Sequence, residues 1–158
     1  MKKKCKVLSL LLSFVVILSV GSVKAEPKTV TVELTIDNNI PTVNGDPVVP
    51  LESEIFIEKG RTFVPVRFPS EVFDIKTIYE SETKTITFAN KKDIEIEMKI
   101  DDTSVKVNGK EMQIDSPPII RRNRTQVPIR FIMETFGAIV TWDPDLHKVT
   151  IVHEIPEE

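Results

Sequence analysis

The chain has very few cysteine, histidine, tryptophan and tyrosine residues. It has 158 residues with one cysteine, one tryptophan, one tyrosine and two histidines. Cys5 precedes a predicted signal cleavage site, so the mature chain has no thiol, which excludes disulfide bonds, thiolate metal sites and cysteine nucleophiles. His147 and His153 alone form an incomplete set of metal ligands. We therefore predict two surface histidines, no metal site and no cofactor.

Residues 1–25 have the pattern of a secretion signal. Four lysines precede an apolar run over residues 7–23, and Val23-Lys24-Ala25 provides a cleavage site before Glu26. A retained membrane anchor is the alternative, although the run is at the short limit of what spans a bilayer. We expect cleavage, a secreted or extracellular protein associated with the cell wall, and no contact with the membrane afterwards.

The mature chain is acidic. The whole sequence has 21 basic and 24 acidic residues, and five of the lysines lie in the leader, so residues 26–158 keep 16 basic against 24 acidic residues, a net charge of −8. Bulk negative charge disfavours binding to nucleic acid and to anionic membranes. We expect no nucleic-acid partner.

An internal repeat determines the organisation of the chain. Val43-Asn44-Gly45 recurs as Val107-Asn108-Gly109 at an offset of 64 residues, and the segment 61–68 recurs as 124–131 at an offset of 63. Such a period indicates a duplicated structural unit. We predict two tandem repeats, at residues 26–90 and 91–158.

Each repeat has the same predicted elements. Apolar and polar residues alternate over 30–36 and over 94–100, as in a strand with one buried face. Each Asn-Gly pair predicts a type I′ hairpin turn, and a second hairpin closes each repeat. Between them, the spacing predicts short helices that begin at Pro65 and Pro128. The fold class is therefore α+β: two tandem units, each a mostly antiparallel β-sheet with one short helix.

The combined motif resembles that of a known family. In the second repeat it comprises Val107-Asn108-Gly109, residues 124–131, Phe136-Gly137-Ala138 and Trp142-Asp143. This pattern is similar to the copper amine oxidase N-terminal-like domain, or stalk domain, and two copies of it cover essentially the whole mature chain. The copper and quinone chemistry of the oxidase belongs to a separate catalytic domain, so the resemblance implies an ancillary, non-catalytic extracellular module. The first repeat and Gln126 depart from the pattern.

Four residues are candidates for a binding site. Tyr79 and Trp142 occupy equivalent strand positions, where they would either stack on sugar rings or cover an edge of the core. Arg67 and Arg130 each have a glutamate four residues later, which predicts either a helix ion pair or an anion clamp.

The sequence favours a non-enzymatic function. No nucleophile–base arrangement or phosphate-binding loop is visible, and we predict no catalytic residue. The leading hypothesis is attachment or assembly, with cell-wall polysaccharide, a surface protein or a second copy of the chain as partner. The alternative is a small extracellular hydrolase that uses two carboxylates, a hypothesis for which no acidic pair is singled out.

Overall fold

The computed structural model describes residues 28–155, and the predicted leader lies outside them. This part of the chain forms fourteen strands and two short helices. In chain order they are β1 Lys28–Thr35, β2 Thr42–Val43, β3 Asp46–Pro47, β4 Phe56–Glu58, β5 Arg61–Pro65, α1 Phe68–Phe73, β6 Lys76–Glu80, β7 Thr85–Ala89, β8 Glu95–Lys99, β9 Ser104–Val107, β10 Lys110–Gln113, β11 Ile119–Arg121, β12 Arg124–Pro128, α2 Ile129–Thr135, β13 Ile139–Asp143 and β14 Lys148–Ile155.

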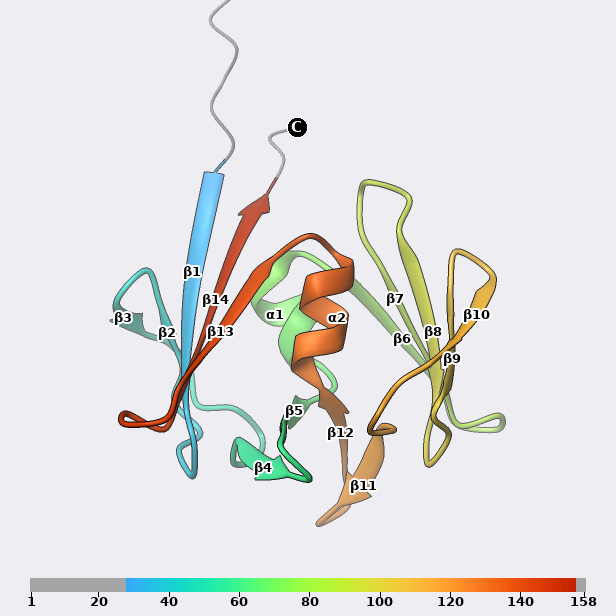
Figure 1. Ribbon diagram of the computed structural model, residues 1–158, viewed down its shortest axis with the longest axis horizontal. Coiled ribbons are helices and arrows are strands. Elements are labelled where there is room, and N and C mark those ends of the chain that lie inside the picture. The colour runs from blue at the N-terminus through green and yellow to red at the C-terminus, as the bar shows by residue number, and fades with distance from the viewer. Residues whose placement is uncertain (1–27, 156–158) are drawn as a thin grey trace, which may run out of the picture.

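The strands form three antiparallel sheets around the two helices. One five-stranded sheet has the order β13-β14-β1-β2-β3 and the other β10-β9-β8-β7-β6. A four-stranded sheet has the order β11-β12-β5-β4. The two larger sheets lie on either side of the adjacent helices α1 and α2, and the smaller sheet lies below them (Figure 1). The α+β class with one short helix per repeat is confirmed.

Each sheet takes strands from both repeats, so the expected arrangement of two units with separate sheets is not confirmed. Strand β7 of the first repeat pairs with β8 of the second, and β14 pairs with β1 from Lys28↔Ile155 to Thr35↔Lys148. The reason for the first pairing lies in residues 90–94. The Asn90 side-chain oxygen accepts hydrogen bonds from the backbone N–H groups of Lys92 and Ile94, each at 3.0 Å, and this tight reversal brings β8 beside β7.

The second pairing brings the two ends of the described chain together. Lys28 and Ile155 are register partners, and both strand ends lie at the top of Figure 1. The β14–β1 pair lies at the centre of its sheet, as the β7–β8 pair does in the other large sheet. The difference is that a turn connects β7 to β8, whereas β14 and β1 are the two ends of the described chain. An ion pair across it, from Lys148 Nζ to Glu33 Oε1 at 2.5 Å, lowers the pKa of the Glu33 carboxyl.

One hydrophobic core serves both repeats. The buried cluster includes Val32 and Leu34 from β1, Ile151 from β14 and Ile96 from β8. Phe68 of α1 is fully buried within it. Because the cluster is continuous across the repeats, the described residues form a single packed body.

The Asn-Gly turns form as predicted in both repeats. Asn44 and Asn108 have φ values of 53° and 49°, and the following glycines have φ values of 90° and 76°. Each asparagine also accepts a backbone hydrogen bond from the neighbouring strand, Asn44 from Thr31 at 2.9 Å and Asn108 from Glu95 at 2.7 Å. The asparagine therefore fixes the hairpin and also joins it to the preceding strand.

The helices begin later than predicted. Pro65 ends β5, and Pro128 ends β12 with an extended conformation at the N-cap of α2. The two prolines belong to the strand pair β12–β5, where Pro65 lies opposite Gln126 and Pro128 opposite Phe63. In α1 the proline of the first turn is Pro69. No helix within residues 28–155 is long and apolar enough to cross a membrane.

Candidate functional site

Two cross-repeat ion pairs lie at equivalent positions of the scaffold. Arg61 of the first repeat binds Asp115 of the second, and Arg124 of the second repeat approaches Glu52 of the first, with 3.6 Å between Nη1 and Oε2. Each arginine opens the motif strand of one repeat, and each acid belongs to the loop of the other. A cleft lies beside each of these ion pairs.

The cleft beside Arg124 lies between α1, β6 and the start of β12, and we call it the β6 cleft. Its volume is about 460 Å³. It is lined by Glu52, Val66, Arg67, Ser70, Thr77, Tyr79, Asn123, Arg124 and Thr125. Two of the four candidate residues from the sequence, Arg67 and Tyr79, are thus brought together.

Arg67 does not form the helix ion pair that its spacing predicts. Its Nη1 donates to Glu52 Oε1 at 2.6 Å, whereas the predicted partner was Glu71. The physical reason is the late start of α1: Arg67 occupies the N-cap, and its side chain turns toward the loop before β4. Glu52 is thereby held between two guanidinium groups, Arg67 on one oxygen and Arg124 on the other.

Tyr79 and Trp142 differ in exposure although they occupy equivalent strands. Tyr79 is 43% exposed on β6 and lines the β6 cleft. Trp142 is half-buried, packs against the core, and stacks on His147 with 6.4 Å between ring centroids. Of the two proposed aromatic platforms, the geometry favours Tyr79, and Trp142 covers the core.

The part of the β6 cleft that lies between α1 and β6 is filled at the equivalent place of the second repeat, between α2 and β13. At the offset of 63 residues, Met133 replaces Ser70 and Val140 replaces Thr77, and both replacements are buried. Arg130, the equivalent of Arg67, donates to the Val140 carbonyl oxygen at 2.7 Å. The first repeat is therefore open between its helix and the following strand, where apolar side chains are packed in the second repeat.

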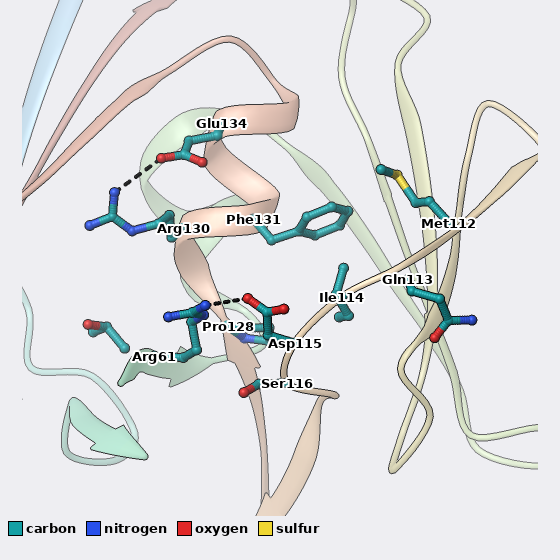
Figure 2. A pocket seen from close by; sticks show the side chains of 11 residues that line it. Arg61, Met112, Gln113, Ile114, Asp115, Ser116, Pro128, Arg130, Phe131 and Glu134 are labelled. Carbon is teal, nitrogen blue, oxygen red and sulfur yellow. Dashed lines mark hydrogen bonds and ion pairs between the residues drawn. The ribbon is translucent and has the colours of Figure 1, made fainter. Parts of the chain in front are cut away.

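The cleft beside Arg61 lies between α2 and the loop after β10, and we call it the α2 cleft. Figure 2 shows Phe131 on α2 facing Met112 and Ile114, with Asp115 bound to Arg61 below them. The volume is about 340 Å³. Arg130 also lines this cleft and forms the predicted ion pair with Glu134 at 3.2 Å, which confirms the helix-pair interpretation for this arginine.

Comparison with known families gives a match over both repeats. The sequence model of the copper amine oxidase N-terminal domain matches residues 18–88 and again residues 56–151. The chain belongs to this family. The predicted resemblance, with two copies, is confirmed. Comparison with curated proteins and with solved structures gives no significant match.

The copper amine oxidase N-terminal domain is a non-catalytic, stalk-type domain, and the clefts of this chain agree with a structural module. In both clefts the acid contributed by the loop is bound by an arginine. Such ion pairs fix the position of a carboxylate and neutralise its charge, as arginine does in structural sites and in anion-binding sites. The α2 cleft contains two carboxylates, Asp115 and Glu134, and each of them is paired with an arginine.

The two histidines of this family member lie apart from both clefts. His147 is exposed at the turn before β14, with a φ of 48°. His153 is buried on β14, contrary to the predicted surface position, with its ring edge-on to Phe73 at 5.8 Å between centroids. Burial lowers the pKa of His153, and the positive charge of Lys92 adds to the effect. Within residues 28–155, no group of three or more His, Cys, Asp or Glu side chains is placed to hold a metal ion.

Sequence reasoning missed Glu52, Asn123 and Arg124 as cleft residues. Arg124 was visible only as part of the repeated motif, and its role depends on cross-repeat packing that the motif does not encode. A usable signal was present in Gln126, the polar residue at a position that is usually apolar in this family. Gln126 is buried and donates to Ser53 Oγ at 2.7 Å across the repeats, which shows that the motif strand of one repeat contacts the loop of the other.

Proposed function

We propose that this chain is a secreted, non-catalytic attachment module that binds cell-wall polysaccharide or a surface protein at the bacterial cell surface. The leader pattern over residues 1–25 supports export. Membership of a stalk-type domain family supports a structural role over a catalytic one.

One observation carries the proposal: most residues that the repeats share are used to build the scaffold, whereas the repeats differ at Ser70, Thr77 and Tyr79, which line an open polar cleft of the first repeat. Asn44 and Asn108 form turns, and Val64 and Val127 are fully buried. Tyr79 is exposed at the edge of its sheet, on a strand that is paired on one side only. A scaffold that leaves such a polar cleft open is suited to contact with another molecule.

The test is a pull-down of residues 26–158 against purified cell wall and, separately, against solubilised surface proteins. We expect the wild-type chain to be retained by one of these two materials. Tyr79→Ala should reduce retention, whereas Trp142→Phe keeps an aromatic ring against the core and should leave retention unchanged. A wild-type chain that is captured by neither material and elutes as a monomer contradicts the proposal.

A further inference from the structure

We propose that the β6 cleft binds an acidic saccharide unit, through a carboxylate or phosphate group held by Arg67 and Arg124. This inference rests on the proposed attachment function and names the ligand class of its site.

The two guanidinium groups have hydrogen-bond donors left over after their ion pairs with Glu52. Each guanidinium has five N–H donors in a planar fork, and Glu52 takes one contact from each group. The Arg67 side chain is 66% exposed and that of Arg124 is 54% exposed, so the remaining donors are accessible to a ligand. Arginine forks bind carboxylate and phosphate oxygens in a bidentate manner.

The local charge agrees with an anionic ligand. The lining of the cleft contains two arginines and one glutamate, a net charge of +1. Residues 26–158 as a whole have a net charge of −8. A locally positive cleft on an acidic protein attracts one anionic group at this place and repels anions elsewhere.

The rest of the lining favours a sugar over a peptide. Ser70, Thr77 and Tyr79 offer hydroxyl groups and Asn123 offers an amide, all of which suit the hydroxyl groups of a saccharide. The exposed ring of Tyr79 adds an amphipathic face for a sugar ring. An acidic peptide would need apolar pockets for its side chains, and Val66 is the one aliphatic residue of the lining.

The two clefts differ in charge, which predicts that the ligand binds in the β6 cleft. The α2 cleft contains the equivalent arginines Arg61 and Arg130, but Asp115 and Glu134 bring its net charge to 0. In the second repeat, Met133 and Val140 occupy the space that is open beside Ser70 and Thr77. Arg130 donates hydrogen bonds to Glu134 and to the Val140 carbonyl oxygen, both of which belong to the same repeat as Arg130. The second repeat therefore provides a matched internal control for the first.

The experiment is a calorimetric titration of residues 26–158 with four probes. These are an oligogalacturonate, which carries carboxylates, a glycerol phosphate oligomer, neutral maltotetraose and a short polyglutamate peptide. We expect one of the two acidic polyol probes to bind with an affinity that falls as salt rises, and the one that binds identifies the anionic group. Equal or tighter binding of maltotetraose or of polyglutamate overturns the assignment.

Variants then locate the site. Arg67→Gln and Arg124→Gln should each weaken binding about tenfold or more, because each removes a charge-assisted hydrogen bond. Arg130→Gln, at the position equivalent to Arg67, should leave the affinity unchanged. Unchanged affinity in both Arg67→Gln and Arg124→Gln overturns the assignment.

A third variant closes the cleft without removing charge. Ser70→Met with Thr77→Val introduces the side chains of the second repeat, and we expect it to remain folded by circular dichroism and to lose binding. Retained binding by this folded variant overturns the proposal. If Arg67→Gln with Arg124→Gln still binds cell wall in the pull-down, attachment stands and the cleft assignment fails. If the wild type binds an acidic probe but neither cell wall nor surface protein, the cleft assignment stands and attachment fails.

Discussion

The shared sheets predict that neither repeat folds alone as a monomer. Residues 26–90 and residues 91–158 would be produced as separate chains. In the intact protein, β1 of the first repeat pairs along its eight residues with β14 of the second, and β7 pairs with β8. Strand β5 of the first repeat also pairs with β12 of the second, so separation removes three pairings at once and exposes a new edge in each of the three sheets.

The expected loss is as large as the stability of a domain. Val30, Val32 and Leu34 of β1 are at most 4% exposed in the intact chain. Their neighbouring strand on one side is β14, so separation returns much of this face to water. At about 1.5–3 kcal/mol for each aliphatic side chain, three of them lose about 5–9 kcal/mol. Domains are stabilised by about 5–15 kcal/mol in total.

The assay is thermal unfolding by circular dichroism, with the molecular mass measured by sedimentation. Each half alone should show no cooperative transition as a monomer, and an equimolar mixture should recover one. A half that folds only as a dimer also agrees with the structure, because a second copy then supplies the missing strands. A cooperative transition in monomeric 26–90 would refute the reasoning.

Three further predictions concern single residues, each measured by urea denaturation. Because burial lowers the pKa of His153, protonation favours the unfolded chain, so stability should fall as the pH drops below about 6.5, by up to about 1.4 kcal/mol per pH unit. His153→Gln should flatten the pH dependence of stability, and the control His147→Gln, at an exposed position, should not. A pH profile of stability that is as steep in His153→Gln as in the wild type contradicts this role of His153. Asn108→Ala removes a hydrogen-bond acceptor and a residue suited to positive φ, which should lower the free energy of unfolding by about 1–3 kcal/mol. Asn44→Ala should lower it by a similar amount because the turns are equivalent. A large difference between the two variants would show that the turns are not equivalent. Leu34→Ala should cost about 2–5 kcal/mol, and a loss below 1 kcal/mol would contradict its placement in the shared core.

Local structure followed from the sequence because local rules determine it. The alternation over 30–36 predicts β1, and the Asn-Gly pairs predict their turns through the positive φ that the turn requires. Gly137, with a φ of 87°, follows the C-cap of α2, the position at which glycine is favoured. These features depend on neighbouring residues, so a single sequence contains the information.

The partners of the strands did not follow from the sequence. A repeat of about 60 residues can close its sheet on itself or share it with the other copy, and both arrangements have the same alternation pattern. The choice depends on the turn held by Asn90, whose side chain caps the N–H groups of Lys92 and Ile94. This short connection brings β7 and β8 together, and the second sheet must then be completed by β14 and β1.

The candidate site could be predicted only in part, because it also depends on how the two repeats pack together. Tyr79 could be selected because the other repeat has Trp142 at the equivalent position. Arg67 could be selected because the other repeat has the same residue, Arg130, at the equivalent position. Glu52 and Arg124 join them only through cross-repeat packing. Another place where the repeats differ serves the scaffold: Arg121 lies over the ring of Phe56, with 3.9 Å to its centroid.

The duplication explains how the space between α1 and β6 can stay open at a tolerable cost in stability. Both repeats contribute to one core, so the apolar residues that close the second repeat, Met133 and Val140, stabilise the whole body. Ser70 and Thr77 at the equivalent places of the first repeat give up that burial, and the difference of two apolar side chains amounts to about 3–6 kcal/mol. A repeat that folded alone would have little stability left after such a loss. In the shared body the cost is spread over a core of twice the size, which frees the first repeat to keep a polar, accessible cleft.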